Sequence, residues 1–127
     1  MIDFKVGLQL YSVRDYMEKD VEGTLEKVSL AGYEYVEFAG YFGYTSSQIK
    51  AMLEKYNLKC ISVHQGIEDF VSEKSESVEF LKELGVKYVS LPWLDKDKHK
   101  GGSKFHQAIE EITRAAKFLK QRDIEIL

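Results

Sequence analysis

Residues 33–39 read Tyr33-Glu34-Tyr35-Val36-Glu37-Phe38-Ala39, with a glycine on each side. Aromatic and β-branched residues dominate this run, and such a composition bounded by glycine is typical of a β-strand. Four more runs of this kind occur along the chain. We therefore predict five strands, at residues 6–13, 33–39, 58–64, 86–91 and 124–127.

Amphipathic stretches of helical period separate these runs. One begins after Asp20, a good N-cap residue, and ends before Gly32, where a residue that terminates a helix belongs. The next opens with a capping box formed by Thr45 and Gln48, the third ends at Gly85, and the fourth begins near Ser103. The side chains predicted to face the core are Val21, Leu25 and Val28; Ile49, Met52, Leu53 and Tyr56; Val78, Leu81 and Leu84; and Phe105, Ile109, Ile112, Ala116 and Leu119.

This alternation predicts an α/β fold with a parallel sheet and right-handed crossovers. Two architectures fit it. One is an open, doubly wound sheet of about five strands, and the other is the first half of a (βα)8 barrel, which needs about 250 residues in total. The period of the pattern does not choose between them.

Composition narrows the class of protein. The 127 residues, of which 44% are hydrophobic and 31% charged, predict a single globular domain spanning residues 1–127. A net charge of −3 provides no basic field for nucleic acid or an anionic membrane. The single Cys60 has no disulfide partner within the chain, and residues 1–5 do not resemble a signal peptide. The expected location is the cytoplasm, without contact to a membrane.

Ligands of parallel α/β folds bind at the carboxyl ends of the strands. This rule selects Gln9, Tyr11 and Arg14 after the first run, Glu37 in the second, His64 and Gln65 at the third, and Trp93 at the fourth.

Glu37 is the most informative of these residues. A carboxylate between Val36 and Phe38, near the end of a strand, is unfavourable unless it is paired or used. Strand alternation places Tyr35, Glu37 and Ala39 on one face. The competing interpretation is an edge strand that leaves Glu37 in solvent.

His64 ends the third run, where Cys60 and Ser62 are expected to share its face. Next to Glu37 on the neighbouring strand, His64 would complete an acid–base or ligand pair, although a single histidine at a strand end also serves as a structural hydrogen-bonding residue. Trp93 is open to two interpretations as well, a pocket wall that stacks on sugar rings or a packing residue. Cys60 itself is interpreted as a small buried residue.

Other motifs carry less information. Gly101-Gly102-Ser103-Lys104 at a predicted helix start could hold a phosphate, but a flexible loop explains these residues more simply. No dinucleotide-binding glycine pattern follows any strand, and no nucleophile elbow is present.

Three of the strand segments together resemble the opening of sugar phosphate isomerases/epimerases, which are xylose-isomerase-like TIM barrels. These segments are residues 6–15, from Val6 to Asp15, residues 32–40, around Glu37, and residues 58–64, which end in His64. The similarity continues through residues 86–94, which contain Pro92-Trp93. The order of these motifs is more specific than any one of them.

The resemblance implies that the chain supplies strands one to four and the start of strand five of a barrel. It further implies that Glu37, His64, Trp93, Gln9 and Tyr11 contact a sugar or sugar phosphate. In such enzymes a divalent metal (Mn²⁺, Mg²⁺ or Zn²⁺) is held by strands five to eight, so no complete catalytic or metal-ligand set is expected in residues 1–127. Pro92-Trp93 stands where the related zinc endonucleases have a histidine, which argues against that branch.

A half-barrel exposes one face and two strand edges, so we expect it to form a homo-oligomer through these edges. Two copies related by a two-fold axis would place two Glu37 and two His64 side chains at one mouth, provided that the short fifth strand is displaced. The alternative function is a non-catalytic, self-associating α/β module that binds a small polar ligand. A flavodoxin-like open domain, which would have helices on both faces of its sheet, is a third possibility.

Overall fold

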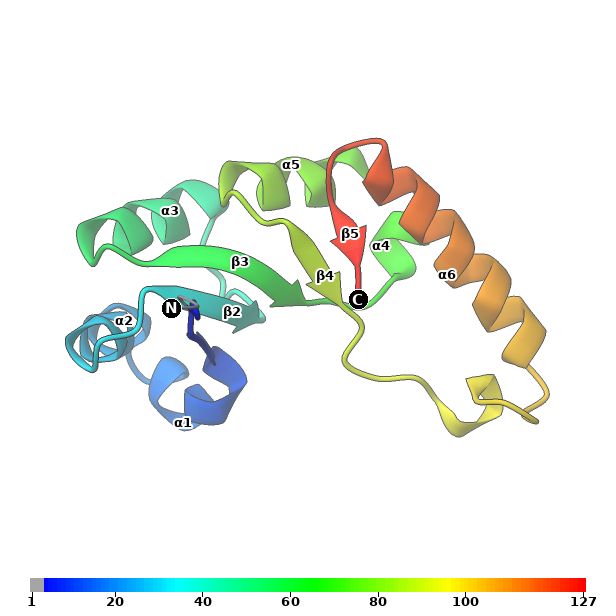
Figure 1. Cartoon of the computed structure of the whole chain (residues 1–127), viewed down its shortest axis with the longest axis horizontal. Coiled ribbons are helices and arrows are strands. Elements are labelled where there is room, and N and C mark those ends of the chain that lie inside the picture. Colours follow the sequence, from blue (N-terminus) through cyan, green and yellow to red (C-terminus); the bar gives the residue numbers. More distant parts are fainter. Residues whose placement is uncertain (1–3) are drawn as a thin grey trace.

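The computed structural model describes residues 4–127; the first three residues of the segment compared with signal peptides lie outside them. Five parallel strands form one sheet in the order β1-β2-β3-β4-β5 (Figure 1). Their positions confirm the five predicted runs. The strands are β1 (Gly7–Gln9), β2 (Tyr35–Ala39), β3 (Lys59–His64), β4 (Tyr88–Ser90) and β5 (Glu125–Ile126).

Two of the helices between the strands begin where the sequence predicts, and the short helices α1 and α4 were not predicted. The Asp20 side chain accepts a hydrogen bond from the Gly23 backbone N–H at the start of α2, and Thr45 and Gln48 form the predicted capping box of α3. The longer helices are α2 (Val21–Leu30), α3 (Ser46–Lys55), α5 (Ser75–Glu83) and α6 (Phe105–Lys120), and the short ones are α1 (Arg14–Met17) and α4 (Glu68–Val71).

The strand order decides between the two predicted architectures. A doubly wound sheet reverses its strand order at a switch point, and this reversal places helices on both faces. Here every strand pairs with the next one along the chain, so right-handed crossovers place the helices on one face. Figure 1 shows α3, α5 and α6 on the same side of the curved sheet. The structure is therefore half of a TIM barrel with the start of its fifth strand, and the flavodoxin-like expectation is wrong.

The core lies between the sheet and the helices. Val36, Phe38, Val63 and Val89 of the strands are fully buried there. The helices contribute the predicted side chains Leu25, Ile49, Val78, Leu81 and Leu119 to the same core. Since strand side chains alternate between faces, the residues between these apolar positions point to the opposite side, the inner face of the half-barrel.

The first predicted strand is too long. The chain leaves the sheet after Gln9, and residues Leu10–Val13 form a 3-10 helix that leads into α1. This turn buries Leu10 and Met17 almost completely. Packing of these two side chains overrides the strand propensity of the Leu10–Val13 segment.

The buried stripe of α6 is shifted by one residue from the predicted one. Ala108, Ala115, Phe118 and Leu119 are buried, whereas Ile109 is 46% exposed. The helix packs against α4 and β5, and its alanines allow close approach on that side. The predicted positions of Phe105, Ile112 and Ala116 are only half-buried as a result.

Among residues 4–127, no helix combines the length and the apolar character that crossing a lipid bilayer requires.

Candidate functional site

A β-bulge shapes the inner face of the sheet. The β2–β3 register shifts between Val36 and Glu37, so that Glu37 pairs with Ser62 and Ala39 with His64. The bulge reverses the alternation along β3. The expectation that Cys60 shares a face with His64 is therefore wrong, because Cys60 is buried in the core instead.

Glu37 and His64 meet at the carboxyl ends of β2 and β3. His64 Nε2 lies 3.0 Å from Glu37 Oε1. Ser90 Oγ, at the end of β4, donates to Glu37 Oε2 over 3.4 Å and also lies 3.4 Å from Ser62 Oγ. Three neighbouring strands thus contribute to one polar cluster, which disproves the edge-strand interpretation of Glu37.

Gln9 completes this cluster from β1. Its amide nitrogen lies 3.1 Å from His64 Nδ1 and 2.9 Å from His64 Nε2. The amide N–H can only donate, so an arrangement in which Nδ1 accepts from Gln9 and Nε2–H donates to Glu37 satisfies both partners. In this arrangement Gln9 and Glu37 hold the His64 ring between them.

The cluster is accessible to a ligand. The side chains of Glu37 and His64 are 22% and 25% exposed, respectively. Directly beneath it on the inner face is a pocket of about 220 Å³, whose lining includes Gln9, Glu37, Ile61 and Ser62. A ligand in this space would meet a carboxylate, an amide and a hydroxyl group from β1 to β3.

Two of the predicted site residues lie outside the cluster. Tyr11 is 54% exposed in the 3-10 helix after β1, where the Arg14 guanidinium carbon lies 4.6 Å from the centre of its ring. Trp93 is 76% exposed in the loop that follows β4. Neither side chain makes a hydrogen bond to Gln9, Glu37 or His64 in the described part of the chain.

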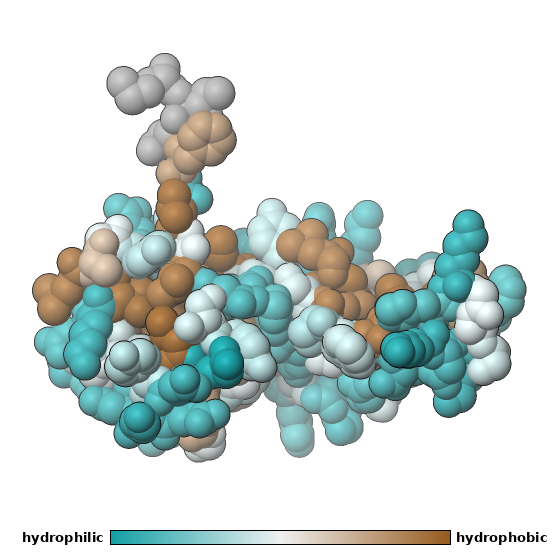
Figure 2. Space-filling view, turned by 90° about the horizontal axis from the view of Figure 1, so that it is seen from below, coloured by the Kyte–Doolittle hydropathy of each residue, from teal (hydrophilic) through white to brown (hydrophobic). Residues whose placement is uncertain are grey.

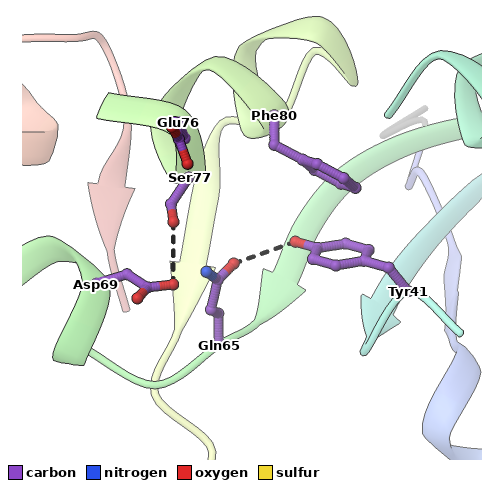
Figure 3. A pocket seen from close by; sticks show the side chains of 6 residues that line it. All are labelled: Tyr41, Gln65, Asp69, Glu76, Ser77 and Phe80. Carbon is purple, nitrogen blue, oxygen red and sulfur yellow. Dashed lines mark hydrogen bonds between the residues drawn. The ribbon is translucent and has the colours of Figure 1, made fainter. Parts of the chain in front are cut away.

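Gln65 follows His64 but belongs to a different pocket, of about 250 Å³ (Figure 3). Tyr41 OH donates to Gln65 Oε1 over 3.1 Å, and the Tyr41 ring packs 4.3 Å from that of Phe80. Burial raises the pKa of Tyr41 above its usual value, so this phenol stays neutral.

On the other side of this pocket, Ser77 Oγ donates to Asp69 Oδ2 over 3.0 Å. Lys74 Nζ lies 2.7 Å from Asp69 Oδ1 and holds the pKa of Asp69 below its usual range. The polar groups of this pocket therefore pair mainly with one another. The Gln9–Glu37–His64 cluster offers more free bonding capacity and is the stronger candidate site.

Cys60 lies close behind this cluster, yet its thiol is expected to be unreactive. Burial raises its pKa to about 12, and Sγ–H donates to the Ser62 carbonyl over 3.3 Å. The thiol is the dominant form below that pH, and alkylation requires the thiolate. We expect iodoacetamide at about pH 8 to modify Cys60 only when the chain unfolds. Mass spectrometry across a urea series measures this, and rapid labelling of the folded chain would contradict it.

Comparison with known proteins supports the fold. No family model matches the sequence, and no curated protein matches it. Among solved structures, the chain is similar to a sugar phosphate isomerase/epimerase from Parabacteroides distasonis, with a TM-score of 0.79 and 24% identity, over 99% of this chain and 51% of that one. A xylose isomerase domain protein from Alicyclobacillus acidocaldarius matches with a TM-score of 0.69 and 16% identity, over 96% and 48% of the two chains.

An AP endonuclease of family 2 from Brucella melitensis matches with a TM-score of 0.62 and 16% identity, over 83% of this chain and 47% of that one. The chain thus spans about half the length of these three structures. At these identities the similarity establishes the fold alone, half of a TIM barrel.

Proposed function

We propose that this chain is the substrate-binding half of a sugar isomerase- or epimerase-type barrel, and that Gln9, Glu37 and His64 bind the hydroxyl groups of a sugar or sugar phosphate. The observation that carries the proposal is the hydrogen-bonded cluster of these three side chains at the carboxyl ends of β1–β3. Barrel enzymes bind their substrates at this end. The similarity to a sugar phosphate isomerase/epimerase structure supports the same substrate class.

The chemistry of the cluster suits a polyol. A carboxylate accepts hydrogen bonds from two neighbouring hydroxyls at once, and the amide of Gln9 provides a donor beside it. Within residues 4–127, Glu37 Oε2 has only the long contact from Ser90, so it can accept a ligand hydroxyl. We assign Trp93 and Tyr11 to the rim, where exposed aromatic rings offer faces for a sugar to stack on.

Isomerisation in such barrels needs more than this half provides. Residues 4–127 contain no group of three or more His, Cys, Asp or Glu side chains suited to a metal ion. Glu37 and His64 supply two ligands, and these do not fit a resident divalent metal on their own. The proposed role of this chain is therefore to bind and orient the substrate, in a reducing compartment such as the cytoplasm, where the free Cys60 thiol persists.

The experiment that tests this function is an NMR titration with ketoses and their phosphates. The chain has three histidines, and His99 and His106 lie in an exposed loop and on an exposed helix face, so their ring signals are internal controls. We expect only the His64 signals to shift, and we expect His64→Ala to weaken binding about tenfold or more. Equal shifts of all three histidines, or none, would refute the proposal.

The second candidate is a non-catalytic module that uses the same cluster to bind a small polar ligand. The lack of a third metal ligand among residues 4–127 favours it. Ligand selectivity separates the two functions. Binding of ketoses or their phosphates that Glu37→Gln weakens supports the isomerase half, whereas binding of other small polar ligands without any response to these sugars supports the module.

A further inference from the structure

Another cavity, of about 490 Å³, lies at the amino ends of β3 and β4. Its walls come from α3, the start of β3, the end of α5 and the residues that lead into β4. Since Lys59 begins β3 and His64 ends it, this cavity lies at the opposite end of the strand from the Gln9–Glu37–His64 cluster. That end of a TIM barrel ordinarily serves stability rather than binding, so a cavity here needs its own explanation.

Lysine side chains surround this cavity. Four lysines and two glutamates line it, so the lining carries two net positive charges, whereas the whole chain carries a net charge of −3. The lysines, all exposed, are Lys50, Lys59, Lys82 and Lys87. Among residues 4–127, only Lys82 of these four forms an ion pair, a long one of 3.8 Å to Glu79.

The two glutamates of the lining, Glu54 and Glu83, do not neutralise these lysines. The hydroxyls of Ser46 and Ser47 donate to the two carboxylate oxygens of Glu83. These bonds, with a smaller effect of the nearby Lys50, hold the pKa of Glu83 below its usual range. Within the described chain, Glu54 forms no ion pair. An anion that enters the cavity therefore meets ammonium groups without having to break an existing pair.

The remaining lining is aliphatic. Leu53, Leu58, Leu84 and Cys60 belong to the buried core and form the floor of the cavity, and Ile61, which is 38% exposed, adds open apolar surface. No aromatic ring from residues 4–127 lines it. A flexible hydrocarbon chain packs against such a lining, whereas a nucleobase or a sugar would find no ring on which to stack. The lining thus favours a ligand with an aliphatic body and an anionic head.

We propose that this cavity binds a small aliphatic carboxylate of the fatty-acid class, with its chain on the leucines and its carboxylate near Lys59 and Lys87. A lysine ammonium group attracts a carboxylate as a point charge and does not require a fixed geometry. The whole lining comes from two neighbouring βα units of the described chain. The proposal does not depend on sugar binding, so it can fail while the proposed function stands.

Apolar surface elsewhere can also bind a hydrocarbon chain. Figure 2 shows hydrophobic side chains among polar ones on the side of the sheet away from α3, α5 and α6. A groove beside β1, with Leu8 and Val28 in its lining, is apolar as well. The experiment must therefore locate the ligand by residue, which an NMR titration of the backbone amides with octanoate does. We expect the shifts to be concentrated in residues 50–61 and 82–87. Shifts concentrated at Leu8 and Val28, or no binding, would overturn the proposal.

Two control ligands separate the contribution of the chain from that of the charge. Butyrate has the same carboxylate on a shorter chain, and we expect it to bind at least about tenfold more weakly than octanoate because fewer CH₂ groups are buried. Octan-1-ol has the chain without the charge, and we expect it to bind about fivefold more weakly. Equal affinities of octanol and octanoate would refute the role of the lysines, and equal affinities of butyrate and octanoate would refute the apolar floor.

Substitution of two lysines tests the proposed position of the carboxylate. Lys59→Gln combined with Lys87→Gln should weaken octanoate binding by about fivefold and leave octanol binding unchanged. The matched control is Lys96→Gln combined with Lys100→Gln, which removes two exposed charges from the loop between β4 and α6 and should leave both affinities unchanged. Circular dichroism establishes that both variants fold. Equal weakening in the two double variants would show that only the overall charge matters and would overturn the site.

Discussion

Replacing Glu37 with leucine is expected to reduce sugar binding by about 10- to 100-fold without lowering the free energy of unfolding. The Glu37 carboxylate makes no packing contact in the core, because it lies on the inner face of the sheet. Its neighbours Val36 and Phe38 point to the other face and fill the core there. A hydrogen bond to a charged group contributes about 1.5–3 kcal/mol, and its loss accounts for the weaker binding. Residues kept for function often lower the stability of the fold, so we expect the fold to tolerate the loss of the Glu37 carboxylate.

The measurement combines the His64 titration with urea denaturation of the same variant. Glu34→Leu is the control, because Glu34 is an exposed glutamate just before β2 and, among the residues that the structure describes, makes no hydrogen bond or ion pair with the cluster. It should bind sugar as the unsubstituted chain does. If Glu37→Leu instead destabilises the chain by more than about 2 kcal/mol, a typical destabilising substitution, Glu37 has a structural role.

Phe38→Ala should have the largest effect on stability. Phe38 is fully buried in β2, and the centre of its ring lies 6.2 Å from that of Tyr41. Truncating a buried phenylalanine leaves a cavity and lowers the free energy of unfolding by about 3–5 kcal/mol. Urea denaturation followed by circular dichroism measures this loss.

Phe42→Ala is the matched control for this substitution. Phe42 is 36% exposed in the loop after β2, so its truncation should lower the free energy of unfolding by less than about 1 kcal/mol. Equal losses for the two variants would show that the core does not lie on the helix side of β2.

Much of this fold was predictable because its signals are local. Alternating strand formers placed β2 and β3, and Asp20 and the Thr45–Gln48 pair placed the starts of α2 and α3. The errors arose where tertiary packing opposes local preference. The segment Leu10–Val13 consists largely of strand formers but turns away from the sheet, because Leu10 and Met17 are buried that way.

The site was predictable to a similar degree. Gln9, Glu37 and His64 converge because parallel strands bring their carboxyl ends to one edge of the sheet. Ser90 was missed, although its alternation with the buried Val89 was a usable signal. The face of Cys60 was not predictable, since a bulge depends on the pairing of β2 with β3 and leaves no mark in the sequence of either strand.

The sequential strand order has a consequence for how the chain folds. Each strand pairs with the strand that follows it, and the connection between the two contains one to three helices. Within residues 4–127 no strand pairs with a strand from the far end of the chain. Each pairing still closes a helical connection, and parallel pairing of this kind forms more slowly than the local contacts of a helical bundle. Nucleation can therefore begin at any neighbouring pair of βα units and spread in both directions, as it does in repeat proteins.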